Sequence, residues 1–515
     1  MRNSSDISQY IKFNSKKRGK KNAIIFQNKK ISYKQLENYI SNLSNFFINF
    51  GIKKDDRIAV VLSNSLEFVY IMFAAARIGA TIVPYNVTLP VKIMKKSFLY
   101  TKINFLIGWH KVVEKIFKER NIERIINKRN AITVGNKSIK FKNFDEFANK
   151  KYSLIRIKKT RNLLNNDYII ALTSGSTGNP KPIILTQKTK LLRSLYTKNI
   201  YNLNSKSVVI ASTPLYHTLA QRLVLLPIIM GGTSIILSGF STKKWFSEVK
   251  KNNVTFSMLV SSQIENIVNY KKNIFSKLKS LKTIVSSSAK LHEDAKNKIK
   301  ILKSPNFYEI YGTSEIAAVT NMKINGNTSK INSVGKKNSF ASIKIIDNKN
   351  RFQKSGTIGE IICKTPLIFS GYLNKPNKTS LCFHKGYFKT GDMGYLDKDD
   401  YLYFSSRKKN IIIVGGINVY PEDIEKSLKK NSQVKDCCVF GVKNKILGEQ
   451  IIASIIPQKK IINENKLKEY CSENLADFQQ PRYYTFVKKF PTSTLGKIDR
   501  KKLIKNFLSG EENKK

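Results

Sequence analysis

The chain has 515 residues, of which 41% are hydrophobic and 10% aromatic, so it carries enough apolar material for large packed cores and is not a wholly disordered protein. The length predicts at least two folding units, because single cores stop growing at about 250–300 residues. Lys and Arg number 92 against 35 Asp and Glu, and the resulting formal charge of +57 by itself favours a polyanionic partner.

The basic residues are spread along the whole chain and are not gathered in one arm. They include runs within 16–21, 157–161 and 458–460, and Lys, Ile and Asn, which share A/T-rich codons, abound together. Scattered charge is typical of a solvated surface. We therefore attribute the charge to genome base composition and expect no nucleic-acid partner, while weak association with an anionic membrane surface stays open. A basic protein that binds nucleic acid or membrane remains the non-enzyme alternative.

Cysteine spacing and hydropathy predict the compartment. The five cysteines have neither CxxC nor Cys/His metal spacing, which argues against a disulfide framework or a zinc site. No apolar stretch approaches the about 18–20 residues of a membrane-spanning helix, and the amino-terminal segment has no long apolar run. We therefore expect a protein without a transmembrane segment, in the cytoplasm.

Short apolar strands alternate with helical patterns over the first half of the chain. Apolar residues at helical spacing predict a helix over 34–50, which ends at Gly51. We expect further helices at 66–78, 187–200, 219–230 and 243–252, and strands at 57–62, 81–84, 168–172, 208–212, 233–237 and 254–260. The strands are nearly continuous apolar runs, which is typical of parallel strands covered on both faces. This alternation predicts an α/β fold.

The pattern changes after about residue 320. Short strands separated by turns, at 343–347, 359–363 and 401–405, predict a smaller β-rich unit. An α+β set follows, with expected strands at 411–414, 436–442 and 451–457 and helices at 421–430 and 464–474. This set has an ordinary domain size of about 100 residues. We predict an N-terminal domain of residues 1–407 and a C-terminal domain of residues 408–515.

A polar loop follows the strand at 168–172. Residues 172–182 read LTSGSTGNPKP, and such a loop lets backbone N–H groups and hydroxyls converge on phosphate oxygens while Lys181 adds charge. The Walker A spacing is absent. Composition alone favours the alternative, a Ser/Thr/Gly surface turn.

The order of residues in this loop resembles the phosphate-binding signature of the adenylate-forming superfamily, which includes acyl-CoA synthetases, luciferases and peptide-synthetase adenylation domains. Further segments resemble that family's motifs in the same order, at 31–89, 308–315, 387–394, 411–425 and 495–500. Five ordered motifs are far harder to explain by chance than one. The resemblance implies a large multi-layer N-terminal domain, with two parallel-type sheets, helices and a small β-barrel-like unit, and a small mobile α+β C-terminal domain.

The resemblance also implies the site residues. Those of the phosphate loop are Thr173, Ser174, Gly175, Ser176, Thr177, Gly178 and Lys181. In the segment 308–315, Tyr311 would stack against adenine with Gly312 beside it, Thr313 would contact the α-phosphate, and Glu315 would hold Mg²⁺. One carboxylate beside phosphates suits Mg²⁺, which usually takes one or two protein carboxylates. A helix cap or solvated charge is the alternative for Glu315, and a core position is the alternative for Tyr311.

Three residues further along complete the implied site. Asp392 would accept both ribose hydroxyls, with Arg407 as a second contact, although an Asx turn would also explain the aspartate. Lys497 would bridge the attacking carboxylate and the α-phosphate. Joining a carboxylate to ATP brings two anions together, so a catalyst mainly has to neutralise charge and align the attack.

The position of Lys497 near the carboxyl end implies a moving domain, because one pose cannot present both this lysine and a thiol channel. By resemblance, the hinge lies near Lys409. Gly416 would let the pantetheine arm of CoA approach the backbone for the second step, in which the CoA sulfur attacks the acyl-adenylate and AMP leaves.

The segment 212–221 bears on which carboxylic acid is the substrate. It resembles the corresponding segment of acyl-CoA synthetases and lacks the Asp or Asn by which other branches recognise amino or aryl acids, so a buried amine would have no partner. His217 would orient the carboxylate or gate the acyl tunnel, a structural histidine being the alternative. Residues 286–291 read SSSAKL where many members have SGGAPL, which changes the pocket wall.

We therefore predict an ATP- and Mg²⁺-dependent acyl-CoA synthetase that acts on a carboxylic acid, ATP and CoA, and we favour a medium or long acyl chain. An acyl-AMP ligase that loads a carrier protein is the alternative enzyme.

Overall fold

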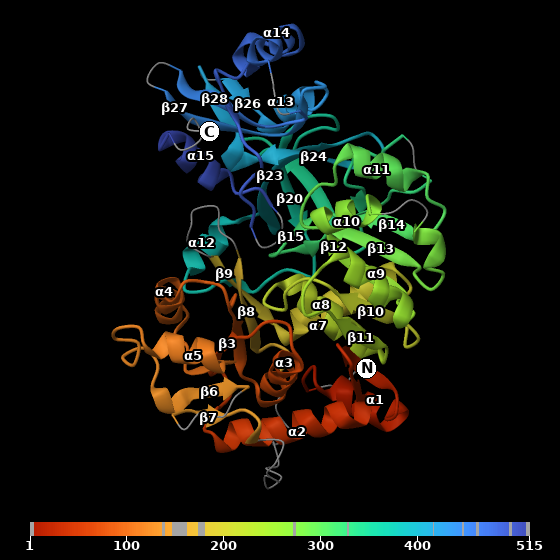
Figure 1. The fold of residues 1–515 in the computed structure, drawn as a ribbon, viewed down its shortest axis with the longest axis vertical. Coiled ribbons are helices and arrows are strands. Elements are labelled where there is room, and N and C mark those ends of the chain that lie inside the picture. The colour runs from red at the N-terminus through yellow and green to blue at the C-terminus, as the bar shows by residue number, and fades with distance from the viewer. Residues whose placement is uncertain are drawn as a thin grey trace.

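The computed structural model describes residues 5–135, 140–146, 162–173, 181–270, 274–326, 329–415, 417–444, 447–459, 463–493 and 497–510. The chain forms a large N-terminal part and a smaller C-terminal part, which is drawn in blue at the top of Figure 1. Within the described residues, no helix combines the length and the apolar character needed to cross a membrane.

Two sheets organise the N-terminal part. The first sheet consists, in spatial order, of β18 (Lys336–Lys337), β17 (Thr320–Lys323), β14 (Asn306–Glu309), β13 (Thr283–Ser287), β12 (Phe256–Val260), β10 (Val208–Ala211), β11 (Thr233–Ile236), β1 (Asn22–Phe26) and β2 (Lys29–Ser32). The second consists of β21 (Gly371–Tyr372), β9 (Lys181–Thr186), β8 (Asp167–Thr173), β4 (Thr81–Pro84), β3 (Arg57–Val61), β5 (Phe105–Trp109), β6 (Ala131–Val134) and β7 (Lys142–Asn143).

Most neighbouring strands run parallel, from β14 to β1 in the first sheet and from β8 to β7 in the second. Successive strand residues point to opposite faces. In β3, Ile58 and Val60 therefore enter the core that joins the two sheets, whereas Ala59 and Val61 enter the core on the other face. The predicted α/β fold with strands covered on both faces is confirmed.

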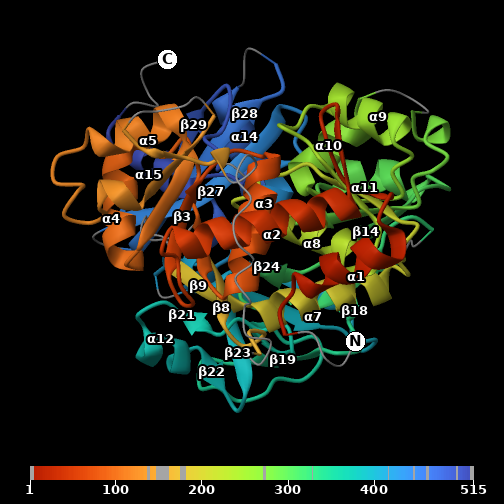
Figure 2. The same cartoon turned by 90° about the horizontal axis from the view of Figure 1, so that it is seen from below.

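The helices form layers on these sheets. The core that joins the sheets includes α2 (Tyr33–Asn49), α3 (Leu66–Ile78), α7 (Gln187–Ile200) and α8 (Thr218–Met230). The outer face of the first sheet packs against α9 (Thr242–Lys251), α10 (Ser261–Val268) and α11 (Glu293–Lys300), and that of the second against α4 (Val91–Thr101) and α5 (His110–Phe117). Figure 2 shows α2 crossing the lower face, with α1 (Gln9–Arg18) beside it.

Local sequence explains where α2 begins. The Ser32 hydroxyl accepts from the backbone N–H of Gln35, and the Gln35 side chain accepts from the Ser32 backbone, which together form a capping box. Apolar residues at helical spacing, among them Leu36, Ile40 and Leu43, are buried. The predicted helix 34–50 is confirmed with a shift of one residue.

A third, antiparallel sheet lies between the two parts of the chain (Figure 1). It consists of β19 (Ser342–Ile346), β20 (Gly359–Lys364), β23 (Tyr387–Leu396) and β22 (Phe383–His384), with β24 (Leu402–Arg407) paired to β23. A short hairpin of β15 (Gly312–Thr313) and β16 (Ala317–Ala318) stands apart from it, and α12 (Pro376–Leu381) precedes β22. This sheet is the β-rich unit expected after residue 320.

The C-terminal part has its own sheet and cores. The sheet order is β26 (Ile417–Val419), β25 (Ile412–Val414), β28 (Gly448–Pro457) and β27 (Val434–Asn444), with β29 (Tyr483–Phe486) paired to β28. Its helices are α13 (Pro421–Leu428), α14 (Glu464–Asn474) and α15 (Arg500–Leu508). The described residues of the two parts also form the 3₁₀ turns η1 (Lys128–Asn130), η2 (Ile274–Lys277), η3 (Lys408–Asn410) and η4 (Asp477–Gln479). Because β24 ends at Arg407 and η3 leads into β25, the chain passes between the two parts where we predicted the boundary; the domain limits and the hinge stay predictions.

One polar contact joins the two parts near α11. The Lys429 ammonium, just after α13, donates to Nδ1 of His292 at 3.3 Å. Lys429 also pairs with Asp436 of β27 at 2.7 Å, while Nε2 of His292 lies 3.9 Å from Glu265. The C-terminal part therefore contacts α10 and α11 through partly exposed charged and polar side chains.

Candidate active site

The predicted phosphate loop connects two paired strands. β8 and β9 are antiparallel, with Thr173 opposite Lys181. Ser174, Gly175, Ser176, Thr177 and Gly178 lie outside the described residues, as does Gly416, so their roles stay predictions. Lys181 is half-buried at the start of β9, and its charge is felt by Lys378 of α12 and by Lys409.

A buried carboxylate lies where β23 meets β24. Asp392 is 1% exposed, and Arg407, its partner across the strands, places Nε at 2.7 Å from Oδ1. The Tyr311 hydroxyl donates to Oδ2 at 2.8 Å. Burial raises the pKa of Asp392, and the Arg407 charge and the Tyr311 hydrogen bond oppose this shift. The structure thus brings three predicted nucleotide-site residues together, and it adds a bond between Tyr311 and Asp392 that the sequence did not indicate.

The hairpin after Tyr311 requires its glycine. A Cβ on Gly312 would lie 1.7 Å from the carbonyl oxygen of Ala317 on the facing strand, so a side chain cannot fit. In the same hairpin, the Thr313 hydroxyl is buried without a hydrogen-bond partner among the described residues. A buried hydroxyl in this state costs free energy. It therefore fits the predicted contact with a phosphate oxygen.

Glu315 lies in the turn of this hairpin, between β15 and β16, and is held at two points. Its Oε1 accepts from the Tyr372 hydroxyl at 3.0 Å, and its backbone oxygen accepts from Arg193 at 2.9 Å. The described residues contain no cluster of three His, Cys, Asp or Glu side chains that would by itself hold a metal ion. A single carboxylate fits Mg²⁺, which is commonly bound through one or two carboxylates, substrate phosphates and water.

Lys497 reaches this site from the carboxyl end. Its backbone turns in a small loop, in which the Ser493 N–H donates to the Lys497 oxygen at 2.8 Å and the Lys497 N–H donates to the Ser493 hydroxyl at 3.2 Å. The side chain keeps access to solvent. Nevertheless, burial of the amine and then the Arg407 charge lower the pKa of Lys497 to about 8, while Asp392 and Glu315 oppose this shift. The amine therefore lies within electrostatic reach of both carboxylates.

His217 immediately precedes α8, at the same site. Burial, and then the charge of Lys497, lower the pKa of His217 to about 4. The imidazole is therefore neutral near pH 7. It can give or accept a hydrogen bond from a substrate carboxylate, but it supplies no positive charge.

Comparison with known proteins assigns the chain to a family. Residues 11–373 match the AMP-binding enzyme family, and residues 423–497 match the AMP-binding enzyme C-terminal domain. The chain belongs to the AMP-binding enzyme family. This confirms the resemblance to adenylate-forming enzymes and favours an enzyme over a basic binding protein without catalytic activity.

Relatives of this AMP-binding enzyme are named for different acids. A long-chain-fatty-acid–CoA ligase of Bacillus subtilis is 25% identical, over 94% of this chain and 91% of its own length. A 2-succinylbenzoate–CoA ligase of Listeria monocytogenes is also 25% identical, over 94% of this chain and 96% of its own. An indoleacetate–CoA ligase of Aromatoleum aromaticum is 23% identical over 96% of both.

Solved structures confirm the fold of this AMP-binding enzyme. ATP-bound MatB from Rhodopseudomonas palustris superposes with a TM-score of 0.87 at 24% identity, covering 98% of this chain and 99% of that one. The o-succinylbenzoate CoA synthetase of Bacillus subtilis, in complex with its acyl-adenylate intermediate, gives a TM-score of 0.84 at 21% identity, covering 96% and 97%. The large N-terminal and small C-terminal domains are thus those of adenylate-forming enzymes.

The pKa of Lys497 predicts how adenylation by this AMP-binding enzyme depends on pH. The folded-state value of about 8 lies below the ordinary 10.5, so the amine loses its proton as the pH rises through about 8. If the charged form acts on the phosphate, kcat/KM for ATP in the adenylation half-reaction should fall above about pH 8. Lys497→Arg should move this fall to higher pH, because arginine stays protonated. A profile that is the same for both proteins would contradict the role of the lysine charge.

In the segment 286–291, one residue has an unusual backbone conformation. Ser288 stands where many members have glycine, and it adopts a left-handed conformation with φ of 82°. This conformation costs a residue with a side chain about 1–3 kcal/mol. Next to it, Ser286 is opposite Glu309 in the first sheet, and Glu309 forms a buried ion pair with Lys296 of α11.

The sequence alone did not identify two residues of the site, Arg193 and Tyr372. Arg193 lies on α7, in the helix layer between the sheets, and it is 3% exposed. A charged residue on a helix that packs between two sheets is unusual, and this could have indicated a functional role for Arg193. Tyr372 had no comparable signal, because it becomes part of the site only through the pairing of β21 with β9.

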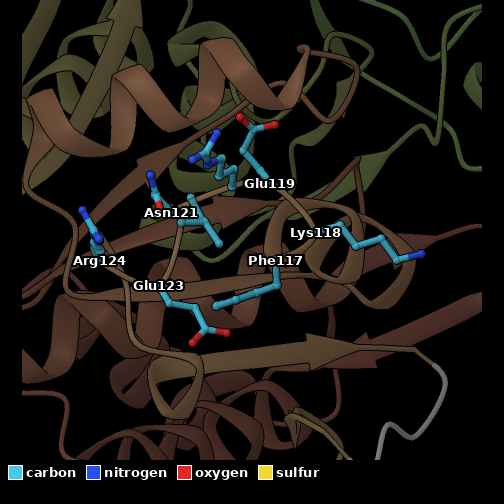
Figure 3. Close-up of a pocket in the computed structure, with 8 residues that line it drawn as sticks. Phe117, Lys118, Glu119, Asn121, Glu123 and Arg124 are labelled. Carbon is cyan, nitrogen blue, oxygen red and sulfur yellow. The ribbon is translucent and has the colours of Figure 1, made fainter.

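A surface hollow elsewhere belongs to none of these motifs. It follows α5, has a volume of about 410 Å³ and is lined by residues 117–124 (Figure 3). Its lining mixes basic and acidic side chains, including Lys118, Glu119 and Arg124. It contains no predicted site residue, so we do not assign it to catalysis.

Proposed function

We propose that the protein is an ATP- and Mg²⁺-dependent acid–thiol ligase, an AMP-forming acyl-CoA synthetase. In the first half-reaction a carboxylate oxygen attacks the α-phosphorus of ATP, the bond to pyrophosphate breaks, and an acyl-adenylate forms. In the second, the sulfur of CoA attacks the acyl carbon and AMP leaves. The observation that carries the proposal is the convergence of Lys497 with Asp392 and Glu315 in one site.

The first half-reaction needs positive charge between two anions. The Lys497 amine would lie between the attacking carboxylate and the α-phosphate and offset their repulsion. The buried Thr313 hydroxyl would donate to a phosphate oxygen. Glu315 would hold Mg²⁺, which when bound offsets the remaining phosphate charge. Lys181 and the loop before it would hold the other phosphates.

The nucleoside end would lie against Asp392 and Tyr311. The Asp392 carboxylate is oriented by Arg407 and by the Tyr311 hydroxyl, so its remaining lone pairs are available to ribose hydroxyls. The Tyr311 ring would stack against adenine. The hydrogen bond between Tyr311 and Asp392 would hold the tyrosine ring and the carboxylate in a fixed relative position for binding the nucleotide.

The second half-reaction would require the C-terminal part to turn about Lys409. Burial and then the charges of Arg407 and Lys181 lower the pKa of Lys409 to about 8, which supports a position close to the phosphate site. In the turned pose Lys497 would leave the site and Gly416 would line the path of pantetheine. The bond between Lys429 and His292 would have to break.

For the acid, we propose a medium or long acyl chain. The segment 212–221 offers no carboxylate for a substrate amine, and the neutral His217 suits a hydrogen bond to the substrate carboxylate. The relatives are named for fatty, succinylbenzoic and indoleacetic acids. An acyl-AMP ligase that loads a carrier protein is the second candidate, since it shares the first half-reaction.

A panel of carboxylic acids tests this proposal. Purified protein, ATP and Mg²⁺ are incubated with straight-chain acids of increasing length, aryl acids and amino acids, and pyrophosphate release is followed with and without CoA. We expect release that depends on a medium or long acid, and acyl-CoA as product. A thioester formed on carrier protein but not on CoA would favour the second candidate. No release with any acid would overturn the proposal.

A further inference from the structure

The peptide group of Glu315 is fixed from two sides. Its backbone oxygen accepts from Nη2 of Arg193 at 2.9 Å and from the Phe369 N–H at 2.7 Å. Two donors on one carbonyl oxygen use both of its lone pairs. The backbone from which the Glu315 side chain extends is therefore set by α7 on one side and by the segment before β21 on the other.

Arg193 makes these contacts from a buried position. It is 3% exposed, and its Nε donates to the Leu367 carbonyl at 2.9 Å. Among the described residues, this guanidinium donates to two neutral carbonyl oxygens, those of Leu367 and Glu315. Burial and then the Arg222 charge lower the pKa of Arg193 to about 9, and Glu315 opposes this shift. A buried cation without a paired carboxylate is costly, so a packing role alone would be met more cheaply by an apolar residue.

The Glu315 carboxylate has its own partner. The Tyr372 hydroxyl donates to Oε1 at 3.0 Å, and Tyr372 is 9% exposed. Its ring packs edge-on against Phe369 at 5.0 Å, which limits its rotation. A tyrosine phenol is ordinarily protonated near neutral pH, so it remains a donor. Oε2 is left to take another partner.

We propose that Tyr372 and Arg193 are positioning residues that prepare Glu315 to bind the metal. Tyr372 holds Oε1 so that Oε2 is presented to the ion, and Arg193 holds the peptide group behind it. Both residues lie on elements next to β9, the strand that begins at Lys181, because β21 pairs with β9 and α7 follows β9 directly. The arrangement thereby ties the metal carboxylate to the strand that carries the phosphate loop. This inference rests on the proposed function, in which Glu315 holds Mg²⁺.

Tyr372→Phe tests the inference, because it removes only the hydroxyl and keeps the ring. We expect the Mg²⁺ concentration for half-maximal adenylation to rise about tenfold. The rate at saturating Mg²⁺ should change far less. In a second measurement, paramagnetic resonance of Mn²⁺ with the full chain and ATP should show the same loss of metal affinity.

Tyr100→Phe is the matched control. The Tyr100 hydroxyl also donates to this segment, but its acceptor is the Leu373 carbonyl, at 2.8 Å, and not Glu315. It should leave the Mg²⁺ midpoint unchanged. Arg193→Lys keeps the charge and loses the planar two-point contact, so it should raise the midpoint while thermal unfolding reports any loss of stability separately.

Glu315→Gln separates failure of the inference from failure of the proposed function. If Glu315→Gln raises the Mg²⁺ midpoint but Tyr372→Phe behaves like Tyr100→Phe, the positioning role is overturned and the proposed function stands. If Glu315→Gln itself leaves the titration unchanged, the metal role of Glu315 is wrong and the inference fails with it.

Discussion

Replacing Lys497 with Ala should lower acid-dependent exchange of pyrophosphate into ATP by about 100-fold or more, the usual cost of removing a group that stabilises transition-state charge. The amine lies in electrostatic reach of Asp392 and Glu315. It is therefore placed to act when the carboxylate meets the α-phosphate. Attack of CoA on supplied acyl-adenylate should change little, since in the proposed second half-reaction the C-terminal part has turned and Lys497 has left the site.

The two half-reactions have to be measured separately for this variant. Lys502→Ala is a suitable control, because Lys502 is an exposed lysine on the neighbouring α15 and contributes similar charge to the surface. It should leave both half-reactions intact. An equal loss of both half-reactions in Lys497→Ala would refute the assigned role, because it would indicate a general defect of the C-terminal part.

Lys296→Met should destabilise the protein by about 3–5 kcal/mol, the usual cost of breaking a buried ion pair from one side. Lys296 and Glu309 form an ion pair whose side chains are both 2% exposed. Without the ammonium, the Glu309 charge would remain buried and uncompensated. Urea unfolding of the variant and of the parent chain would measure the difference in free energy of unfolding.

The matched comparison is Lys468→Met on α14. Lys468 pairs with Glu464 at 2.8 Å on the exposed surface, where ion pairs contribute little. A double variant, Lys296→Met with Glu309→Leu, should recover much of the lost stability because it removes the uncompensated charge. If Lys296→Met were no more destabilising than Lys468→Met, the buried pair would not stabilise the fold as argued here.

Loss of the ion pair between Lys296 and Glu309 should also affect the active site. Oε1 of Glu309 accepts from the Leu291 N–H at 2.8 Å and so holds the segment 286–291 against β14. That strand leads directly into Tyr311 and Gly312. We therefore expect weaker ATP binding in Lys296→Met under conditions where the chain remains folded.

Local sequence determined most of the fold. Hydrophobic periodicity placed α2 and α8 within one residue of their observed limits, since burial of one face decides both helices. Continuous apolar runs predicted the parallel strands because both faces of each sheet are covered. The ordered motifs placed Tyr311, Asp392 and Arg407 in one site, and the structure brings these side chains together.

The contacts that orient this site were not predictable from local sequence. The bond from Arg193 to Glu315 joins residues 122 positions apart, and the bond from Tyr311 to Asp392 joins residues 81 apart. Such pairs depend on how sheets and helices pack, which periodicity does not encode. The neutral state of His217 likewise follows from burial and the approach of Lys497, both of which are tertiary effects.

The contact between Lys429 and His292 is one of the contacts that hold the C-terminal part in the observed pose. It is a single exposed hydrogen bond at 3.3 Å, and Lys429 keeps its bond to Asp436 whether or not the two parts separate. An exposed bond of this kind contributes about 1 kcal/mol, which is less than tenfold in an equilibrium ratio. This hydrogen bond therefore favours the observed pose only slightly over the turned pose. Binding of nucleotide or formation of the adenylate can shift the population between the two poses within each turnover.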